Sequence, residues 1–202
     1  MKNAIRQPRQ ERSIEKKNRI IEAGYELFSE VGYYGTNTAE IAKRAGVSTG
    51  IVYGYFADKR DILICVLEIY IDEVFKPIAN LFDTLTAPVD VALIIPKVLD
   101  ETIRMHKKKS KIHETLHSLA GSDEAVNAKF IALEDKLTLK IYDILSNLGV
   151  EYEDLKERIH FAMGIIQNFC HEYVFDSHEY IDYKAMRKMV NKTLIHLISS
   201  KA

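Results

Sequence analysis

Two histidines four residues apart offer the most specific chemistry in this sequence. The stretch KKKSKIHETLHSLAGSD contains His113, Glu114 and His117 in the pattern H-E-x-x-H. On a helix this spacing places both imidazoles on one face, where they can bind zinc while the glutamate acts as a general base. The pattern raises the hypothesis of a zinc-dependent hydrolase.

The surroundings of the motif argue against catalysis. A catalytic zinc needs a third protein ligand, for which Glu134 on the next predicted helix is a candidate, and an open position for water. Four lysines between residues 107 and 111 give the motif a basic, solvated start, and no predicted strand can align a peptide substrate. We therefore predict no enzymatic activity, no cofactor and no catalytic metal. A structural or sensory metal at His113 and His117 stays open, as does an exposed or pocket-lining histidine pair.

The composition is that of a folded chain without a membrane segment. The 202 residues are 47% hydrophobic and carry a net charge of −1, so the chain can bury a substantial core and disorder is not expected. No apolar run approaches the roughly 20 residues needed to cross a bilayer, and no signal-peptide core is present. Cys65 and Cys170 both lie in apolar helical patterns, which favours free thiols over a disulfide. We expect a soluble, cytoplasmic protein with no membrane partner.

Charge is distributed unevenly along the chain. Residues 1–60 contain eleven Lys or Arg and seven Asp or Glu, a net charge of +4, which leaves −5 for residues 61–202. The basic first part of the chain indicates contact with a polyanion. A chance scatter of charges is the alternative.

Helical periodicity dominates the sequence. We expect a flexible basic arm over residues 1–12, whose arginines could reach DNA, and a first helix over residues 13–32. Asn37 and Glu40 have the spacing of a capping box at the start of a short second helix, and Ser48 can cap a third. Two short helices joined by about three residues that include a glycine are the signature of a helix-turn-helix.

Longer and more apolar helices are expected beyond this point. One begins after Asp58, and five more lie between Pro88 and Ser199. The prediction is an all-α chain of about nine helices. A three-helix, helix-turn-helix head covers residues 13–60, and a larger helical body covers residues 61–202.

The head resembles a known family. The stretch IIEAGYELFSEVGYYGTNTAEIAKRAGVSTGIVYGYFADKRDIL, residues 20–63, is similar to the DNA-binding head of the TetR family of bacterial transcriptional regulators. The residues that carry the resemblance are Phe28, Gly32, Tyr33, Thr36, Ile41, Ala42, Ala45, Gly46, Val47, Ser48, Gly50, Tyr53, Tyr55, Phe56 and Lys59. The resemblance implies a ligand-responsive regulator, a repressor released from a palindromic double-stranded DNA operator by a small-molecule effector.

The third predicted helix is expected to enter the major groove with its first turn nearest the bases. Threonine and tyrosine hydroxyls there can reach phosphates or base edges, and a glycine lets the backbone come close. The predicted DNA-binding residues are Thr38, Thr49, Gly50, Tyr53, Tyr55 and Lys59. Ile51 and Gly54 depart from the side chains usual in the family, so the bases that are read do not follow from the resemblance.

The body is expected to dimerise and to hold the effector. One head makes few base contacts, so a homodimer on two half-sites is expected. The predicted interface on the last two helices is Ala162, Ile166, Tyr173, Met186, Val190, Leu194 and Leu197. The effector pocket implied by the resemblance takes Ile103, His106, Leu116, His117, Phe130, Phe161, Ile165, Asn168 and Phe169. Ordinary core packing is the alternative for both sets.

Overall fold

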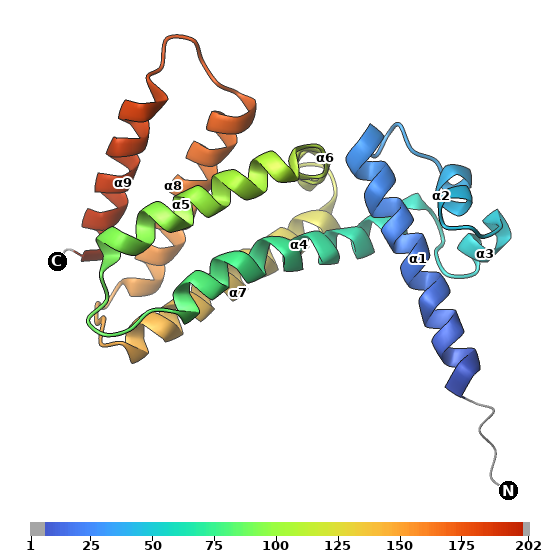
Figure 1. Ribbon diagram of the computed structural model, residues 1–202, viewed down its shortest axis with the longest axis horizontal. Coiled ribbons are helices and arrows are strands. Elements are labelled where there is room, and N and C mark those ends of the chain that lie inside the picture. The colour runs from blue at the N-terminus through green and yellow to red at the C-terminus, as the bar shows by residue number, and fades with distance from the viewer. Residues whose placement is uncertain (1–6, 200–202) are drawn as a thin grey trace, which may run out of the picture. The chain divides into compact units, whose positions relative to one another are not determined.

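The computed structural model describes residues 7–199, and these form nine α-helices and no strand (Figure 1). The helices are α1 (Gln7–Val31), α2 (Thr38–Arg44), α3 (Thr49–Tyr53), α4 (Lys59–Asp83), α5 (Val91–Lys108), α6 (Ser110–Ala120), α7 (Glu124–Asn147), α8 (Leu155–Phe175) and α9 (Tyr183–Ser199). The predicted all-α class with a helix-turn-helix near its start is confirmed. Within the same residues, no helix is both long enough and apolar enough to cross a membrane.

The chain divides into two compact units. Unit 1 comprises the chain up to Tyr70 together with Lys109–Lys129, and unit 2 comprises Ile71–Lys108 and the chain from Phe130 onward. The predicted boundary after residue 60 therefore differs from the observed division, because the first turns of α4 and the whole of α6 pack with the head. The apolar face of α6, which includes Leu116, is buried in unit 1.

Helix α1 is longer than the sequence predicted. It includes Gln7–Arg12, which were expected to belong to a flexible arm, and Pro8 stands in its first turn. Proline is tolerated there because the first backbone N–H groups of a helix have no intrahelical partner. The rest of the predicted arm, including Arg6, lies outside the described residues, as does the side chain of Arg9.

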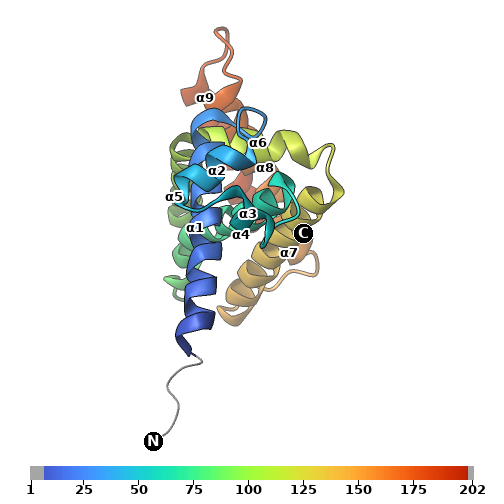
Figure 2. The same cartoon turned by 90° about the vertical axis from the view of Figure 1, so that its right-hand side faces the viewer.

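Unit 1 is built around α1, with α2 and α3 side by side next to it (Figures 1 and 2). Its interior contains the fully buried side chains of Ile20, Phe28, Ile41, Val52 and Ile62, which come from α1, α2, α3 and α4. Helix α2 buries Ile41 and Ala42, and α3 buries Val52, so packing rather than length fixes the position of these short helices.

Local polar interactions begin and end these short helices. Asn37 accepts a hydrogen bond from the Glu40 amide at 3.0 Å, and the Glu40 carboxylate accepts one from the Asn37 amide at 3.2 Å. Gly46 has a φ of +65°, which suits glycine and ends α2. Ser48 Oγ then accepts from the Ile51 amide at 3.3 Å and caps α3. The predicted capping box and helix-turn-helix connection are confirmed.

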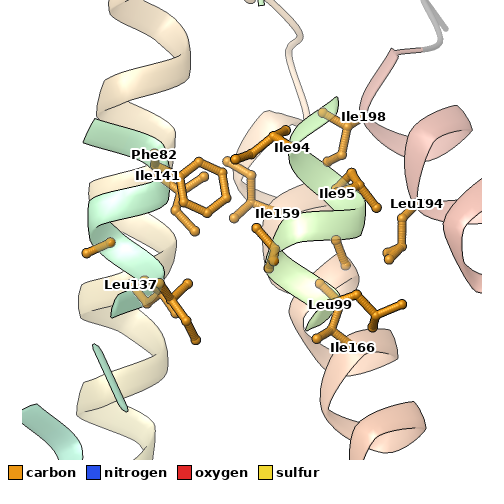
Figure 3. Close-up of a cluster of buried hydrophobic side chains, with 14 of the residues drawn as sticks. Phe82, Ile94, Ile95, Leu99, Leu137, Ile141, Ile159, Ile166, Leu194 and Ile198 are labelled. Atoms are coloured by element: carbon orange, nitrogen blue, oxygen red, sulfur yellow. The ribbon is translucent and has the colours of Figure 1, made fainter. Parts of the chain in front are cut away.

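Unit 2 is a helical bundle formed by α5, α8 and α9 with the second half of α4 and most of α7. Aliphatic and aromatic side chains from all five helices meet in one core, which includes Phe82, Leu99, Leu137, Ile166 and Leu194 (Figure 3). Helix α5 packs against both α8 and α9. This core surrounds the cavity described below.

Candidate nucleic-acid interface and effector cavity

Helix α3 is anchored on one side and open on the other. Val52 is fully buried, whereas Thr49 and Gly50 in the first turn are exposed and Tyr53 is 59% exposed. Helix α3 therefore exposes a threonine hydroxyl, a glycine backbone and a tyrosine phenol on one face, while Val52 fixes the helix from its buried face. A Cβ added at Gly50 would have only the Ser48 hydroxyl nearby, at 3.9 Å, so the outer side of this turn is open.

Tyr55 and Thr38 lie beside this surface in more enclosed positions. The Tyr55 side chain is half-buried, and its hydroxyl is hydrogen-bonded to Ser13 Oγ of α1 at 2.9 Å. Thr38 is the first residue of α2 and is half-buried. Among the predicted hydroxyl contacts, Tyr53 is thus the freely exposed phenol, while Tyr55 joins the end of the helix-turn-helix to α1.

Lys59 joins the loop after α1 to the start of α4. Its Nζ donates to the carbonyl oxygens of Tyr33 and Thr36, both at 2.7 Å, and lies 4.1 Å from the centre of the Tyr33 ring. Partial burial lowers the pKa of Lys59 from its ordinary value. Two of its three N–H donors are therefore committed inside the protein, and one is left for a phosphate.

Arg44, near the end of α2, is neutralised by acidic neighbours. Its guanidinium makes two hydrogen bonds to the Glu30 carboxylate, at 2.9 and 3.0 Å, and one to Glu26 at 3.0 Å. The hydrogen bond from Arg44 lowers the pKa of Glu30. These contacts tie α2 to α1, and the neighbouring Lys43 is the exposed positive charge of this helix.

The H-E-x-x-H stretch lies on α6 and faces the interior of unit 1. His113 is 2% exposed, its Nδ1 is hydrogen-bonded to the Tyr70 hydroxyl at 2.6 Å, and its ring lies 4.0 Å from that of His117. Glu114 is exposed. Burial raises the pKa of Tyr70, so the phenol stays neutral and can share its hydrogen with the imidazole. The hydrogen bond between Tyr70 and His113 thus joins α6 to α4.

Two lysines at the start of α6 also attach this helix to α1. Lys109 Nζ donates to the Tyr25 hydroxyl at 2.7 Å, and Lys111 Nζ donates to the Glu30 carbonyl at 2.6 Å. The lysines that looked like a solvated lead-in therefore hold the motif against the head. Glu134, the proposed third zinc ligand, belongs to unit 2. Across residues 7–199, no group of three or more His, Cys, Asp or Glu is arranged to hold a metal ion.

A narrow cavity lies in the core of unit 2. Its volume, counted as the space that the centre of a water-sized sphere can occupy, is about 80 Å³. Its walls come from α4, the loop after it, α5, α7, α8 and α9, and Thr102 and Gln167 are the only polar residues among them. The lining residues are Ile78, Phe82, Val89, Val91, Ile94, Ile95, Val98, Thr102, Leu137, Ile141, Leu145, Ile159, Ala162, Met163, Ile166, Gln167 and Ile198.

The residues predicted for an effector pocket do not line this cavity. Leu116 and His117 lie in unit 1, where Leu116 is fully buried. The remaining seven lie in unit 2 at other places: Ile103, His106 and Phe169 are buried, Phe130 and Ile165 are half-buried, and Phe161 and Asn168 are exposed. His106 is held by its own helix, since its Nδ1 is 2.8 Å from the Thr102 carbonyl.

Helix α8 has two apolar faces, and the one buried within unit 2 is the face predicted from the sequence to lie in a dimer interface. Ala162 and Ile166, predicted to lie in a dimer interface, are buried and line the cavity. Phe161, predicted to line a pocket, is 61% exposed, and Ile165 on the same face is half-buried. Of the other predicted interface residues, Leu194 is buried within the unit, and four are half-buried: Tyr173, Met186, Val190 and Leu197.

Comparison with known proteins identifies this arrangement. The family model described as bacterial regulatory proteins, tetR family, matches residues 20–66. The transcriptional regulator HbdR of Aromatoleum sp. (strain CIB) is 45% identical over 76 residues, 38% of this chain and 33% of that protein. The transcriptional regulator YuxN of Bacillus subtilis (strain 168) is 30% identical over 154 residues, 76% of this chain and 53% of that protein. The chain belongs to the TetR family.

The family fold extends over both units. A crystal structure of a TetR-family regulator from Mesorhizobium loti MAFF303099 matches with a TM-score of 0.74 at 18% identity, over 93% of this chain and 97% of that one. The chain spans about a third and about half of the two sequence relatives described above. The match of residues 20–66 to the tetR family model confirms the family predicted from the sequence.

None of the cavity-lining residues of this TetR-family protein was predicted from the sequence to line an effector pocket. The missed signal is on α5, where Val91, Ile94, Ile95, Val98 and Thr102 recur at three- and four-residue steps and so share one helix face. That periodicity indicates burial, but a cavity exists only where side chains from other helices fail to fill the space.

Proposed function

We propose that this protein is a repressor that binds a palindromic operator as a homodimer and leaves it when a small molecule occupies the unit 2 cavity. The observation that carries the DNA-binding part is the open face of α3. Thr49, Gly50 and Tyr53 are exposed together, while Val52 fixes the helix from its buried side. A rigid short helix with hydroxyls in this position suits base-edge and phosphate contacts in a major groove.

The residues beside α3 are proposed to contribute to DNA binding in different ways. Thr38 and the remaining donor of Lys59 contact phosphates, and Lys43 adds attraction at longer range. Tyr55 acts mainly by position, because its hydroxyl is already hydrogen-bonded to Ser13. Phosphate contacts hold the head in register, so Tyr53 and Thr49 carry the sequence preference.

The outward faces of α8 and α9 are the proposed homodimer surface. Phe161 is 61% exposed and Met189 is 67% exposed, and half-buried Ile165, Val190 and Leu197 lie on the same two helices. Removing these side chains from water against a second copy is favourable at about 25 cal/mol per Å² of apolar surface. A symmetric pair then presents two heads to the two half-sites of a palindrome.

Helix α4 is the proposed route from cavity to head. It begins at Lys59, next to the helix-turn-helix, and it carries Ile78 and Phe82 of the cavity wall near its other end. An effector that fits one arrangement of this helix better than another shifts the population of the heads toward a spacing that does not match DNA.

The proposal is tested by a gel-shift titration of the purified chain with DNA from upstream of its own gene. We expect saturable binding with two chains per duplex, resistance to excess unrelated DNA, and an affinity that falls steeply with salt. Equal affinity for unrelated DNA, or one chain per site, would contradict it. The binding isotherm without any added small molecule tests DNA recognition separately from effector release.

A further inference from the structure

The cavity in unit 2 is long relative to its volume. Its lining residues extend along α5 from Val91 to Thr102 and along α8 from Ile159 to Gln167, which at 1.5 Å per residue is about 16 Å and about 12 Å. Spread over such a length, the 80 Å³ that the centre of a water-sized sphere can occupy has a mean cross-section of about 6 Å², a radius of about 1.4 Å. Adding the radius of the sphere itself, about 1.4 Å, gives a passage about 5–6 Å wide. A passage this narrow admits an extended hydrocarbon chain, whereas the width of a flat ring exceeds it.

The two ends of the cavity differ chemically. Leu99 and Ile166 lie together toward one end of the cluster, and Ile198 lies toward the other (Figure 3). Thr102 follows Leu99 by one turn of α5, and Gln167 follows Ile166 directly on α8, so both polar residues belong to the first end. The end with Ile198 is lined only by apolar side chains.

The polar end suits a neutral carbonyl group. Thr102 Oγ1 donates to the Val98 carbonyl at 2.8 Å, so the carboxamide of Gln167 is the side-chain group that can donate to a ligand. The lining contains no Lys, Arg or His, and a carboxylate enclosed without a cationic partner is strongly disfavoured. A ligand head placed here is therefore a hydrogen-bond acceptor without charge.

We propose that the effector is an unbranched acyl chain whose carbonyl oxygen accepts a hydrogen bond from Gln167 and whose methyl end lies beside Ile198. A C–C bond of about 1.5 Å advances an extended chain by about 1.25 Å per carbon, so a length of 12–16 Å holds about ten to thirteen carbons. This inference rests on the proposed function, in which the cavity is the effector site, and adds the chemical class and orientation of the ligand.

Calorimetric titration of the full chain with straight acyl groups of 8 to 18 carbons tests the class. The series is run as free acids and as coenzyme A thioesters, beside a branched acyl thioester and a polycyclic aromatic compound. We expect the tightest binding at about ten to thirteen carbons, weaker binding of the free acids, and none of the polycyclic compound. Binding of no chain, or tighter binding of the polycyclic compound, would overturn the inference while leaving operator binding untouched.

Substitutions at the two ends test the orientation. Leu145 lines the cavity one turn beyond Ile141 on α7, at the Ile198 end, so Leu145→Ala should move the optimum toward chains about two carbons longer. Leu133→Ala is the matched control, because Leu133 is buried in the same unit but does not line the cavity.

The polar end is tested with Gln167→Leu. This variant should weaken binding about fivefold at every length without moving the optimum, as expected for one lost hydrogen bond of about 1 kcal/mol. An unchanged optimum in Leu145→Ala, or unchanged affinity in Gln167→Leu, contradicts the orientation. Ile198→Val, a milder change at the apolar end, gives the same test should Leu145→Ala not fold.

Discussion

The contact between α1 and α4 at Gly24 gives a prediction in which two opposing effects can be weighed. Alanine at this position of α1 would be favoured by helix propensity by about 1 kcal/mol. Its Cβ, however, would lie 2.6 Å from Cγ2 of Ile62, a fully buried side chain, whereas carbon atoms in contact are normally about 3.5–4.0 Å apart. Relieving about 1 Å of overlap in a packed core costs about 1–3 kcal/mol. We expect Gly24→Ala to lower the free energy of unfolding by about 1 kcal/mol.

The assay is urea unfolding at 25 °C followed by far-ultraviolet circular dichroism, with Ile62→Ala and the double variant alongside. Ile62→Ala alone should cost about 2–4 kcal/mol, because it leaves a cavity. In the double variant the new methyl group enters that cavity, so the loss should be smaller than the sum of the single losses by about 1 kcal/mol or more. A stabilised Gly24→Ala variant, or strictly additive losses, would refute the described approach of the two helices.

Three further predictions concern charge and thiol chemistry. Arg44→Ala should lower the free energy of unfolding by no more than about 1 kcal/mol, because its glutamate partners are exposed. It should leave the salt dependence of DNA binding unchanged, because these glutamates already neutralise Arg44. Urea unfolding and a salt titration of DNA binding check the two results. Burial raises the pKa of Cys170 from 9.0 to about 12, so at pH 8 its thiolate fraction is about 1,000-fold lower than that of an ordinary thiol, and native protein should resist iodoacetamide at this position in peptide mass spectra. The hydrogen bonds from Arg60 hold the pKa of Asp123 at about 2 against an ordinary 3.8, so its stabilising effect is present above pH 3.8 and is lost as the pH falls through 2; Asp123→Asn should flatten the acid loss of stability in that window.

The head could be predicted in detail because its signals are local. The Asn37 and Glu40 pair, the glycine at residue 46 and the Ser48 cap each act within four residues, and each has the contacts that its residue type predicts. Val52 and Phe56, one helical turn apart, are both buried. Local polar chemistry of this kind is fixed before tertiary packing contributes.

The roles of Tyr55, Lys59 and Arg44 could not be read in the same way. Tyr55 and Lys59 were predicted to contact DNA, but each of the three residues contacts another segment of unit 1 that lies 14 to 42 residues away. Helix α6 presents the same difficulty, because its packing on α1 joins segments about eighty residues apart. Hydrophobic periodicity says that a face is buried and does not name the partner that buries it.

Helix α8 shows most clearly that hydrophobic periodicity does not identify the partner of an apolar face. Two apolar stripes run along this helix, one through Ala162 and Ile166 and the other through Phe161 and Ile165. A helical pattern alone does not distinguish a stripe that meets its own chain from one left outside, and only the packing of α5 and α9 against α8 settles which is which. The cavity was missed for the same reason.

The most direct test of the account is operator binding by Tyr53→Ala measured beside Tyr180→Ala. Tyr53 is 59% exposed on α3, and Tyr180 is an equally polar aromatic, 82% exposed, in the loop between α8 and α9, so neither change should disturb folding. Fluorescence anisotropy with the upstream DNA should show a loss of affinity of about 10-fold or more for Tyr53→Ala, since each head of the proposed dimer loses a contact of about 1 kcal/mol. Tyr180→Ala should keep wild-type affinity. Wild-type affinity in both variants would contradict the claim that the exposed face of α3 recognises DNA.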